Sequence, residues 1–154
     1  MGSNFTNQLK ALEGVTNFEM SNTPAVEKNN EGVIAFSGTL KFRGLVLAFQ
    51  QILSPSITMN MLNVSFMYPT GKKQQKIKIL EALNSFNDAR PALKSVLKSS
   101  GDKGFSVNFS MEFICSDELI GLSMVESLVK VLSSSGSLLK GTFGRHGITL
   151  ALKG

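Results

Sequence analysis

The side chains able to carry catalysis are few in this sequence. His146 is the only histidine and Cys115 the only cysteine, and a thiol beside an imidazole could act as a nucleophile and its base. Cys115, however, lies in phase with the apolar residues of a strand, which predicts a small buried side chain. A zinc site needs several Cys and His ligands, and the adjacent acidic pair Asp117 and Glu118 is better explained as the start of a helix. The sequence predicts no catalytic residues, no metal site and no cofactor.

Basic side chains gather in two stretches, one at the start of a central helix and one around the hairpin that follows it. The lysines of the two stretches are Lys72, Lys73, Lys76, Lys78, Lys94, Lys98 and Lys103. Such a cluster could contact phosphates, and the chain carries a net charge of +5. Its aromatic residues lie mostly in core positions and do not form the interleaved surface on which bases stack. A nucleic-acid-binding module is therefore an alternative prediction.

The composition predicts a globular protein without disulfides. The chain has 154 residues, of which 42% are hydrophobic and 18% are charged, so it is long enough to bury a core. A single cysteine allows no intramolecular disulfide, which favours a reducing compartment, and we expect a cytoplasmic location. Polar residues interrupt the uncharged stretch from Gly44 to Gly71, so we expect no membrane span.

Alternating apolar residues predict a meander of three strands in the first half of the chain. Their connections are too short for a parallel crossover, and the runs are Val33–Phe42, Leu45–Leu53 and Ile57–Tyr68. The apolar phase changes at Met61-Leu62, which predicts a β-bulge or burial on both faces. The stretch Val15–Gly32 is interpreted as a loop that holds at most one edge strand.

Apolar residues at helical spacing predict three helices. The first spans Asn4–Glu13, and the second, over Lys72–Asp88, contains no Gly or Pro. The third starts at Asp117-Glu118, whose charges suit a first helical turn, and ends in the Ser133–Gly136 segment.

Two further strands are predicted between the second and third helices. They are a short edge strand over Ala92–Lys98, in which Ser95 falls on the apolar side, and a strand with clear alternation over Phe105–Cys115. A last strand within Gly141–Gly154 is left open. The order α-β-β-β-α-β-β-α predicts an α+β fold with helices packed on an antiparallel sheet. We expect a single domain over 1–154, with an N-terminal helix and loop over 1–31, a core over 32–135 and a C-terminal tail over 136–154.

The second face of the predicted sheet is nearly free of charge, unlike a typical solvated strand face. We interpret this face as a covered surface. The cover is the first helix with the loop up to Gly32, the C-terminal segment, a second copy of the chain or a partner protein. A two-fold partner would cover the same patch with itself, so a homodimer is predicted. The residues of this predicted partner surface are Thr58, Asn60, Ser106, Asn108, Ser110 and Ile114.

From Gly32 to Ser135 the chain resembles the YbjN-like bacterial proteins and the wider fold of the type III secretion chaperones. The resemblance lies in the segment Leu80–Asn87, with Asn84 and Asn87 spaced i, i+3, followed by a short strand, a hairpin, a long strand and a helix. It implies an α+β sandwich, no catalytic residues and a polypeptide-binding role, often as a homodimer. Secretion chaperones tend to be acidic, and this chain departs from that pattern.

From the residues alone, Asn84 and Asn87 are predicted to have a structural role, because their amides can bond neighbouring backbone groups beside the helix. The leading hypothesis for function is a non-catalytic protein-binding or regulatory domain with chaperone-like properties. The alternatives are the basic nucleic-acid-binding module and a carrier of an apolar ligand.

Overall fold

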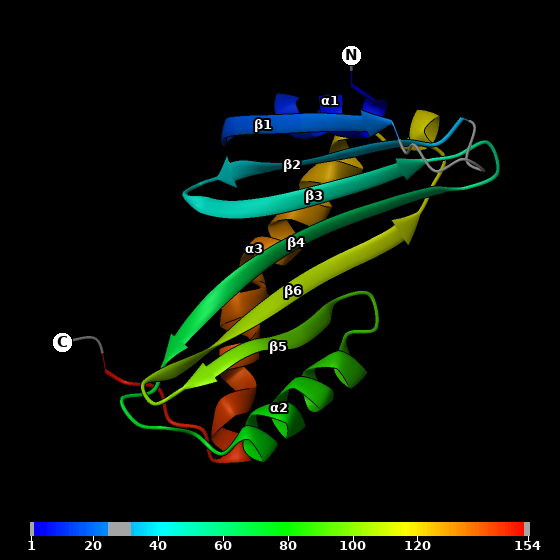
Figure 1. Ribbon diagram of the computed structural model, residues 1–154. Coiled ribbons are helices and arrows are strands. Elements are labelled where there is room, and N and C mark those ends of the chain that lie inside the picture. The colour runs from blue at the N-terminus through cyan, green and yellow to red at the C-terminus, as the bar shows by residue number, and fades with distance from the viewer. Residues whose placement is uncertain (1, 25–31, 153–154) are drawn as a thin grey trace. The chain divides into compact units, whose positions relative to one another are not determined.

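Six antiparallel strands form one sheet among residues 2–24 and 32–152, which the computed structural model describes. The strands follow one another across the sheet in the order β1-β2-β3-β4-β6-β5 (Figure 1). Short connections join β2 to β3, β3 to β4 and β5 to β6, whereas α2 lies between β4 and β5. Their bounds are β1 Val15–Pro24, β2 Ile34–Phe42, β3 Leu45–Leu53, β4 Thr58–Pro69, β5 Lys94–Gly101 and β6 Gly104–Ile114.

Three α-helices accompany the sheet in the described part of the chain. They are α1 (Asn4–Ala11), α2 (Lys76–Ala89) and α3 (Leu122–Phe143), with short 3-10 turns η1 (Asp117–Leu119) and η2 (Gly144–His146). The predicted α+β class with an antiparallel sheet is confirmed. The edge strand left open in the Val15–Gly32 stretch is present as β1.

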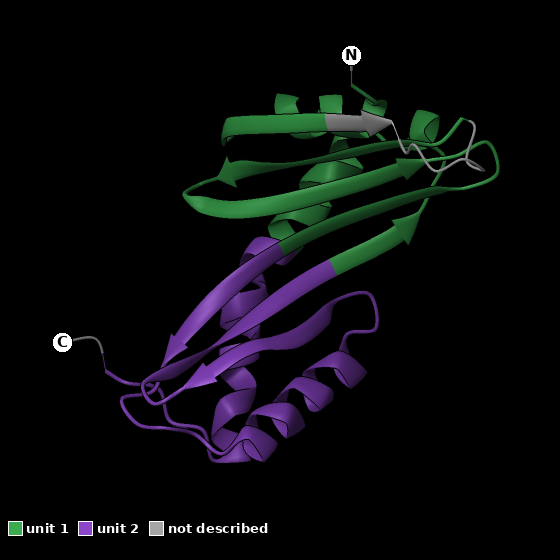
Figure 2. Cartoon of the chain, viewed as in Figure 1, with its two compact units in different colours: residues 1–63, 111–131 green, residues 64–110, 132–154 purple. Residues whose placement is uncertain are grey.

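The chain divides into two compact units, which Figure 2 colours separately. Unit 1 comprises residues 1–63 and 111–131, and unit 2 comprises residues 64–110 and 132–154. Strands β4 and β6 and helix α3 each contribute residues to both units. The single domain expected over 1–154 stays a prediction.

The core of unit 1 is built around Phe5 of α1. This side chain is fully buried and meets Phe49 of β3 and Phe113 of β6 edge-on, with ring centroids 6.5 and 6.0 Å apart. Phe18 of β1 stacks on Phe49 at 5.4 Å. Gly38 of β2 allows the close approach of β1, because an added Cβ would lie 2.0 Å from the carbonyl oxygen of Glu19. Helix α1 thus anchors in the sheet through one aromatic ring.

The core of unit 2 is a cluster of aromatic rings. Tyr68 stacks on Phe105 at 5.3 Å, and Phe143 of α3 meets both rings edge-on at 5.1 and 5.6 Å. Phe86 of α2 meets Phe109 of β6 edge-on at 5.6 Å. Contacts of this geometry add to the free energy of burial. Both helical elements of unit 2 are therefore fixed to the strands by aromatic side chains.

The third helix extends beyond its predicted end, so the expected stop in the Ser133–Gly136 segment is wrong. Serines in that segment are compatible with a helix because a hydroxyl can bond a carbonyl of the preceding turn, as Ser135 does with Leu132. Gly136 is required where it lies, since an added Cβ would come within 2.9 Å of the Phe66 ring. The phenol of Tyr68 also donates to the carbonyl oxygen of Gly136 at 2.9 Å. Packing has overridden the low helix propensity of these residues.

The start of that helix also differs from the prediction. Asp117 and Glu118 do not lie in the first turn of α3, which begins at Leu122 and has no acidic residue there. They form the 3-10 turn η1 instead. The Asp117 carboxylate caps a different helix, because it accepts hydrogen bonds from the backbone N–H groups of Asn4 at 2.7 Å and Phe5 at 3.0 Å.

Burial alternates along the whole of β4, so the phase change predicted at Met61-Leu62 is wrong. Asn60, Leu62 and Val64 are all buried on one face, while Met59 is exposed on the other. The change inferred from the sequence arose because a polar residue, Asn60, occupies a core position. No strand follows η2 in the described residues up to Leu152, so the last strand left open within Gly141–Gly154 is not formed there.

None of the described helices is both long and apolar enough to cross a membrane.

Candidate functional site

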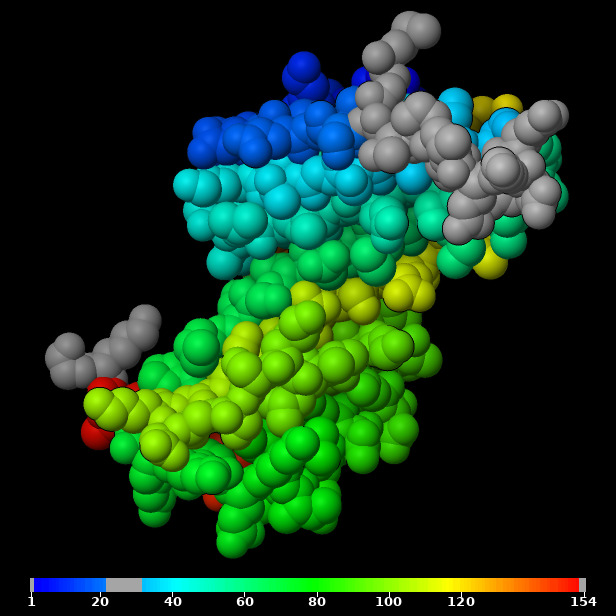
Figure 3. Space-filling view, viewed as in Figure 1, coloured from blue at the N-terminus to red at the C-terminus, as the bar shows by residue number. Residues whose placement is uncertain are grey.

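A groove of about 700 Å³ runs between strand β5 and helix α2 of unit 2, and we call it the β5–α2 groove. Six consecutive residues of β5, Ser95–Ser100, line one side. Leu80, Leu83 and Asn84 of α2 line the other. Figures 1 and 3 show the two elements side by side, with α2 in green and β5 in yellow-green. The groove therefore follows the edge of the sheet.

Strand β5 is an edge strand among the described strands, because it is the last in the sheet order and pairs with β6 alone. An edge strand presents a row of backbone N–H and C=O groups to whatever lies beside it. The pairing of β5 with β6 shifts register between Leu97 and Ser99. Such a bulge increases the local twist and is common next to binding sites.

Asn87 of α2 already pairs with the edge of β5 as a neighbouring strand would. Its Oδ1 accepts from the backbone N–H of Ser95 at 2.7 Å, and its Nδ2 donates to the carbonyl oxygen of Ser95 at 3.1 Å. Oδ1 also accepts from the Ser95 hydroxyl at 2.8 Å. Both backbone groups of Ser95 thus face α2. Since backbone groups alternate sides along an antiparallel strand, those of Leu97 face the groove as well.

Asn84, one helical turn before Asn87, lies exposed in the lining of the β5–α2 groove. The two asparagines singled out by the sequence therefore lie on the same flank of α2, but they have different environments. Asn87 bonds the backbone of Ser95, whereas Asn84 presents its amide to the groove.

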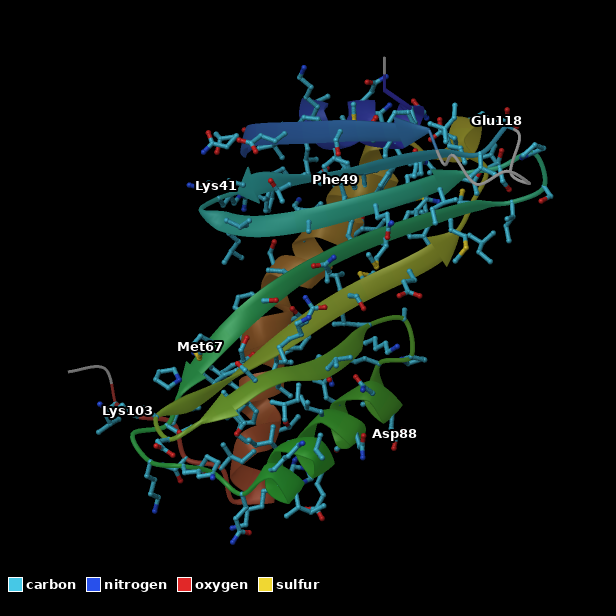
Figure 4. All side chains as sticks on the ribbon, viewed as in Figure 1. Lys41, Phe49, Met67, Asp88, Lys103 and Glu118 are labelled. Carbon is cyan, nitrogen blue, oxygen red and sulfur yellow. The ribbon has the colours of Figure 1, made fainter. Side chains whose placement is uncertain are left out.

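The groove is basic at its margin. Lys73 and Lys76 at the start of α2 and Lys98 of β5 line it, and no acidic side chain is among its described lining residues. Asp88, labelled in Figure 4, lies on α2 outside this lining. The tertiary structure thus brings together three lysines from the two basic stretches recognised in the sequence. Lys94 and Lys103 are exposed elsewhere on unit 2.

Unit 1 contains a polar network in place of a groove of this kind. Nε2 of Gln51 donates to Oδ1 of Asn60 at 2.7 Å and to Oδ1 of Asp117 at 2.9 Å. Gln51 and Asn60 are 0% and 2% exposed. Oε1 of Gln51 has no hydrogen-bond partner among the described residues. This network ties β3 and β4 to the cap of α1. It was not predicted from the sequence, although an amide in the apolar run Leu45–Leu53 was a signal.

The predicted partner surface does not lie on one face of one unit. Thr58, Asn60 and Ile114 belong to unit 1, whereas Ser106, Asn108 and Ser110 belong to unit 2. Asn60 is buried and so is not part of an accessible surface. Asn108 donates to the Ser65 hydroxyl at 3.0 Å on a polar face of unit 2. Ile114 is 69% exposed.

A second depression, of about 470 Å³, lies on the open sheet face of unit 1. Its lining is mainly apolar, from Ile52, Met59, Met61 and Ile114, with Glu112 as the charged member. This differs from the open face of unit 2, where Met67, labelled in Figure 4, is exposed beside serines and asparagine.

The two residues considered for a catalytic dyad lie in different units, Cys115 in unit 1 and His146 in unit 2, so neither unit contains the pair. Cys115 is partly exposed, which corrects the prediction that it is buried in the core. The strand alternation loses its burial towards the end of β6, where Phe113 is also only partly buried. No group of three His, Cys, Asp or Glu side chains suited to a metal is present in the described part of the chain.

No protein-family model matches the chain, and neither a curated protein nor a solved structure does.

Proposed function

We propose that this protein is a non-catalytic protein-binding domain that holds an extended polypeptide segment in the β5–α2 groove. The segment adds a strand to the edge of β5 and lies against α2. In this mode of recognition the main-chain hydrogen bonds supply affinity, and the side chains along the groove supply specificity. The sequence hypothesis of a protein-binding domain is kept, but the binding surface moves from the sheet face to the sheet edge.

The observation that carries this proposal is the pairing of Asn87 with both backbone groups of Ser95. A side-chain amide offers one donor and one acceptor with the spacing of a peptide group, so it takes the place of a strand at that position. Beyond it, Leu97–Ser100 continue along the groove, and among the described residues no other side chain of α2 bonds the edge of β5 in this way. An added strand would extend the pattern that Asn87 begins.

The lining suits a polypeptide better than a nucleic acid. Leu80, Leu83, Val96 and Leu97 give the groove apolar walls, and no aromatic side chain is among its described lining residues. Five of the aromatic side chains of unit 2 are buried in its core, Tyr68, Phe86, Phe105, Phe109 and Phe143. Stacking of bases on exposed rings is the usual source of affinity for single strands. The three lysines of the groove keep nucleic-acid binding as the second candidate.

The test uses octapeptides in which valine alternates with glutamate, glutamine or lysine, each acetylated and amidated. We expect at least one to bind, with the Leu97 amide of the protein becoming protected from hydrogen exchange. Leu80→Trp should weaken this binding at least tenfold, because Leu80 is 36% exposed and lines the groove. Ile77→Trp is the matched control, since Ile77 is 59% exposed on the same helix and lies outside the lining.

Binding that is equally strong in Leu80→Trp and wild type would place the peptide elsewhere and overturn the proposal. Binding of a thymidine dodecamer that Leu80→Trp abolishes, with no peptide bound, would favour the nucleic-acid alternative. Thermal unfolding of both Trp variants shows whether the fold is kept.

The remaining parts of the sequence hypothesis stay proposals. A cytoplasmic location is supported by the single cysteine, and a non-catalytic role by the scarcity of catalytic side chains, since the chain has one histidine and one cysteine. A homodimer is supported by the apolar open face of unit 1, where Met59 and Ile114 are exposed. Light scattering at tens of micromolar, with Ile114→Lys as the variant, tests it, because the added charge should shift the mass towards a monomer.

A further inference from the structure

The charges of the chain are divided unequally between its two units. Unit 2 holds eleven Lys and Arg residues against three Asp and Glu residues, a net charge of +8. Unit 1 holds five basic and eight acidic residues, a net charge of −3. The net charge of +5 therefore conceals a strongly basic unit. Fields of this kind raise the association rate of partners of opposite charge.

Helix α2 begins with charges that oppose its own dipole. The N-terminus of a helix carries a partial positive charge and favours acidic residues. Helix α2 has none in its first turn, and its N-cap residue Gln75 makes no capping hydrogen bond through its side chain. Lys73, Lys76 and Lys78 lie at this end instead. A local arrangement that disfavours the folded state is typical of functional sites. An anion bound here would interact favourably with the helix dipole and reduce the repulsion among the lysines.

Lysine on an edge strand also restricts which strand can be added. Like charges keep two such edges apart, and natural sheets use lysine in this way. A second copy of β5, with its own Lys94 and Lys98, is therefore a poor partner for this edge. A segment that carries carboxylates is accepted by the same side chains.

From these observations, and on the basis of the proposed function, we infer that the segment bound in the β5–α2 groove is an acidic polypeptide. Its backbone pairs with β5 from Leu97 onwards, because Asn87 closes the edge at Ser95. Its carboxylates face Lys73, Lys76 and Lys98 at the margin of the groove. The Asn84 amide, exposed in the lining between Leu80 and Asn87, offers a donor and an acceptor to the backbone of the segment.

The test compares the glutamate–valine octapeptide with its glutamine–valine counterpart, which has the same shape and no charge. We expect the glutamate peptide to bind roughly tenfold more tightly at low ionic strength. This advantage should shrink as salt is added, because the lysines at the margin are exposed and screened. The lysine–valine peptide should bind least.

Two triple variants with the same net charge assign the effect to the groove. Replacing Lys73, Lys76 and Lys98 by glutamine should remove the preference for the glutamate peptide. The matched control replaces Lys94, Lys103 and Lys140 by glutamine. It should keep most of the preference for the glutamate peptide, since these exposed lysines lie outside the groove lining. Equal loss in both variants would show a general effect of net charge and overturn the inference.

The register is tested on the ligand, which leaves the protein unchanged. N-methylation of single residues of the glutamate peptide should weaken binding at alternate positions, because only every second N–H faces β5. Equal binding of the glutamine and glutamate peptides with this alternation intact would overturn the acidic partner but keep strand addition. Tight binding without alternation would overturn strand addition. Failure of all three peptides to bind, with the Leu97 amide unprotected, would overturn both proposals.

Discussion

Both units fix a helix to the strands through an aromatic ring, Phe5 in unit 1 and Phe86 in unit 2, but unit 1 adds a hydrogen-bond network built on a carboxylate. In unit 1 the carboxylate of Asp117 accepts partly buried hydrogen bonds from the backbone of α1 and from the Gln51 amide, which tie α1 to the strands. In unit 2 the helices are fixed by aromatic rings, with Phe86 on Phe109 and Phe143 on Tyr68. A polar network stabilises through satisfied partners and is sensitive to each of them. An aromatic core stabilises through buried area and tolerates polar change outside it.

The two units also differ in the chemistry of their surfaces. Unit 1 has buried amides beside its aromatic core, and Met59 and Ile114 are exposed on its open sheet face. Unit 2 has an aromatic interior and places lysines around the groove. The chemistry of the surface that meets a partner therefore need not follow the chemistry of the core.

The largest effect is expected from the aromatic core of unit 2. Phe109 is fully buried and meets Phe66 and Phe86 edge-on. Phe109→Ala should lower the free energy of unfolding by about 3–5 kcal/mol, because it removes a buried ring and leaves a cavity. Denaturant titration measures the change. Leu152→Ala, at a side chain that is 96% exposed, is the control. A loss in Phe109→Ala no larger than in the control would show that the aromatic rings do not hold this unit.

The polar network of unit 1 should show the next largest effect. Asp117→Ala removes the acceptor for Asn4, Phe5 and Gln51, so we expect a loss of about 2–3 kcal/mol in unfolding free energy. Hydrogen exchange should accelerate first in α1. Glu118→Gln, at the exposed neighbouring position labelled in Figure 4, should change stability by less than about 0.5 kcal/mol. Unchanged protection of α1 in Asp117→Ala would contradict the capping role.

The third prediction concerns Asn87, whose amide bonds the edge of β5 beside the proposed binding segment. Asn87→Ala removes the partners of the Ser95 N–H and C=O groups, and we expect a loss of about 1–2 kcal/mol in stability. The Ser95 amide should lose protection from exchange. Asn84→Ala, on the same flank of α2, should leave stability almost unchanged because its amide is exposed. A larger loss of stability in Asn84→Ala than in Asn87→Ala would contradict the pairing of Asn87 with the strand edge.

At neutral pH the smallest effect is expected from Tyr68, and this effect changes at alkaline pH. Burial raises the pKa of the Tyr68 phenol well above its ordinary value, so ionisation is easier in the unfolded chain. The contribution of this group to stability is fully present below about pH 10 and is lost as pH rises above it, by about 1.4 kcal/mol per unit. Tyr68→Phe should cost about 1 kcal/mol at neutral pH, through the lost bond to Gly136.

Unfolding titrations at several alkaline pH values measure this dependence, and the difference between wild type and Tyr68→Phe isolates it. Tyr68 is the only tyrosine of the chain. A difference that stays constant with pH would show that the phenol is not buried as described.

The sequence by itself determined the class of the fold, because alternation and helical spacing are local properties. The period of two over Phe105–Cys115 predicted β6, and the helical spacing over Lys72–Asp88 predicted α2. The two basic stretches were also visible without a structure. Of the candidate site, the sequence supplied the lysines and the pair Asn84 and Asn87, but not the groove that they line.

The tertiary structure decided what depends on contacts between distant residues. Asp117 is 113 residues from Asn4 in the chain, so no local pattern links it to the cap of α1. Position 136 within α3 requires a glycine because the Phe66 ring of unit 2 occupies the space of a Cβ. The phase of β4 was misread because Asn60 is buried through its bond to Gln51 of β3. Which strand became an edge, and which lysines came to lie beside it, followed from the order of strands across the sheet, and that order is set by packing between segments far apart in sequence.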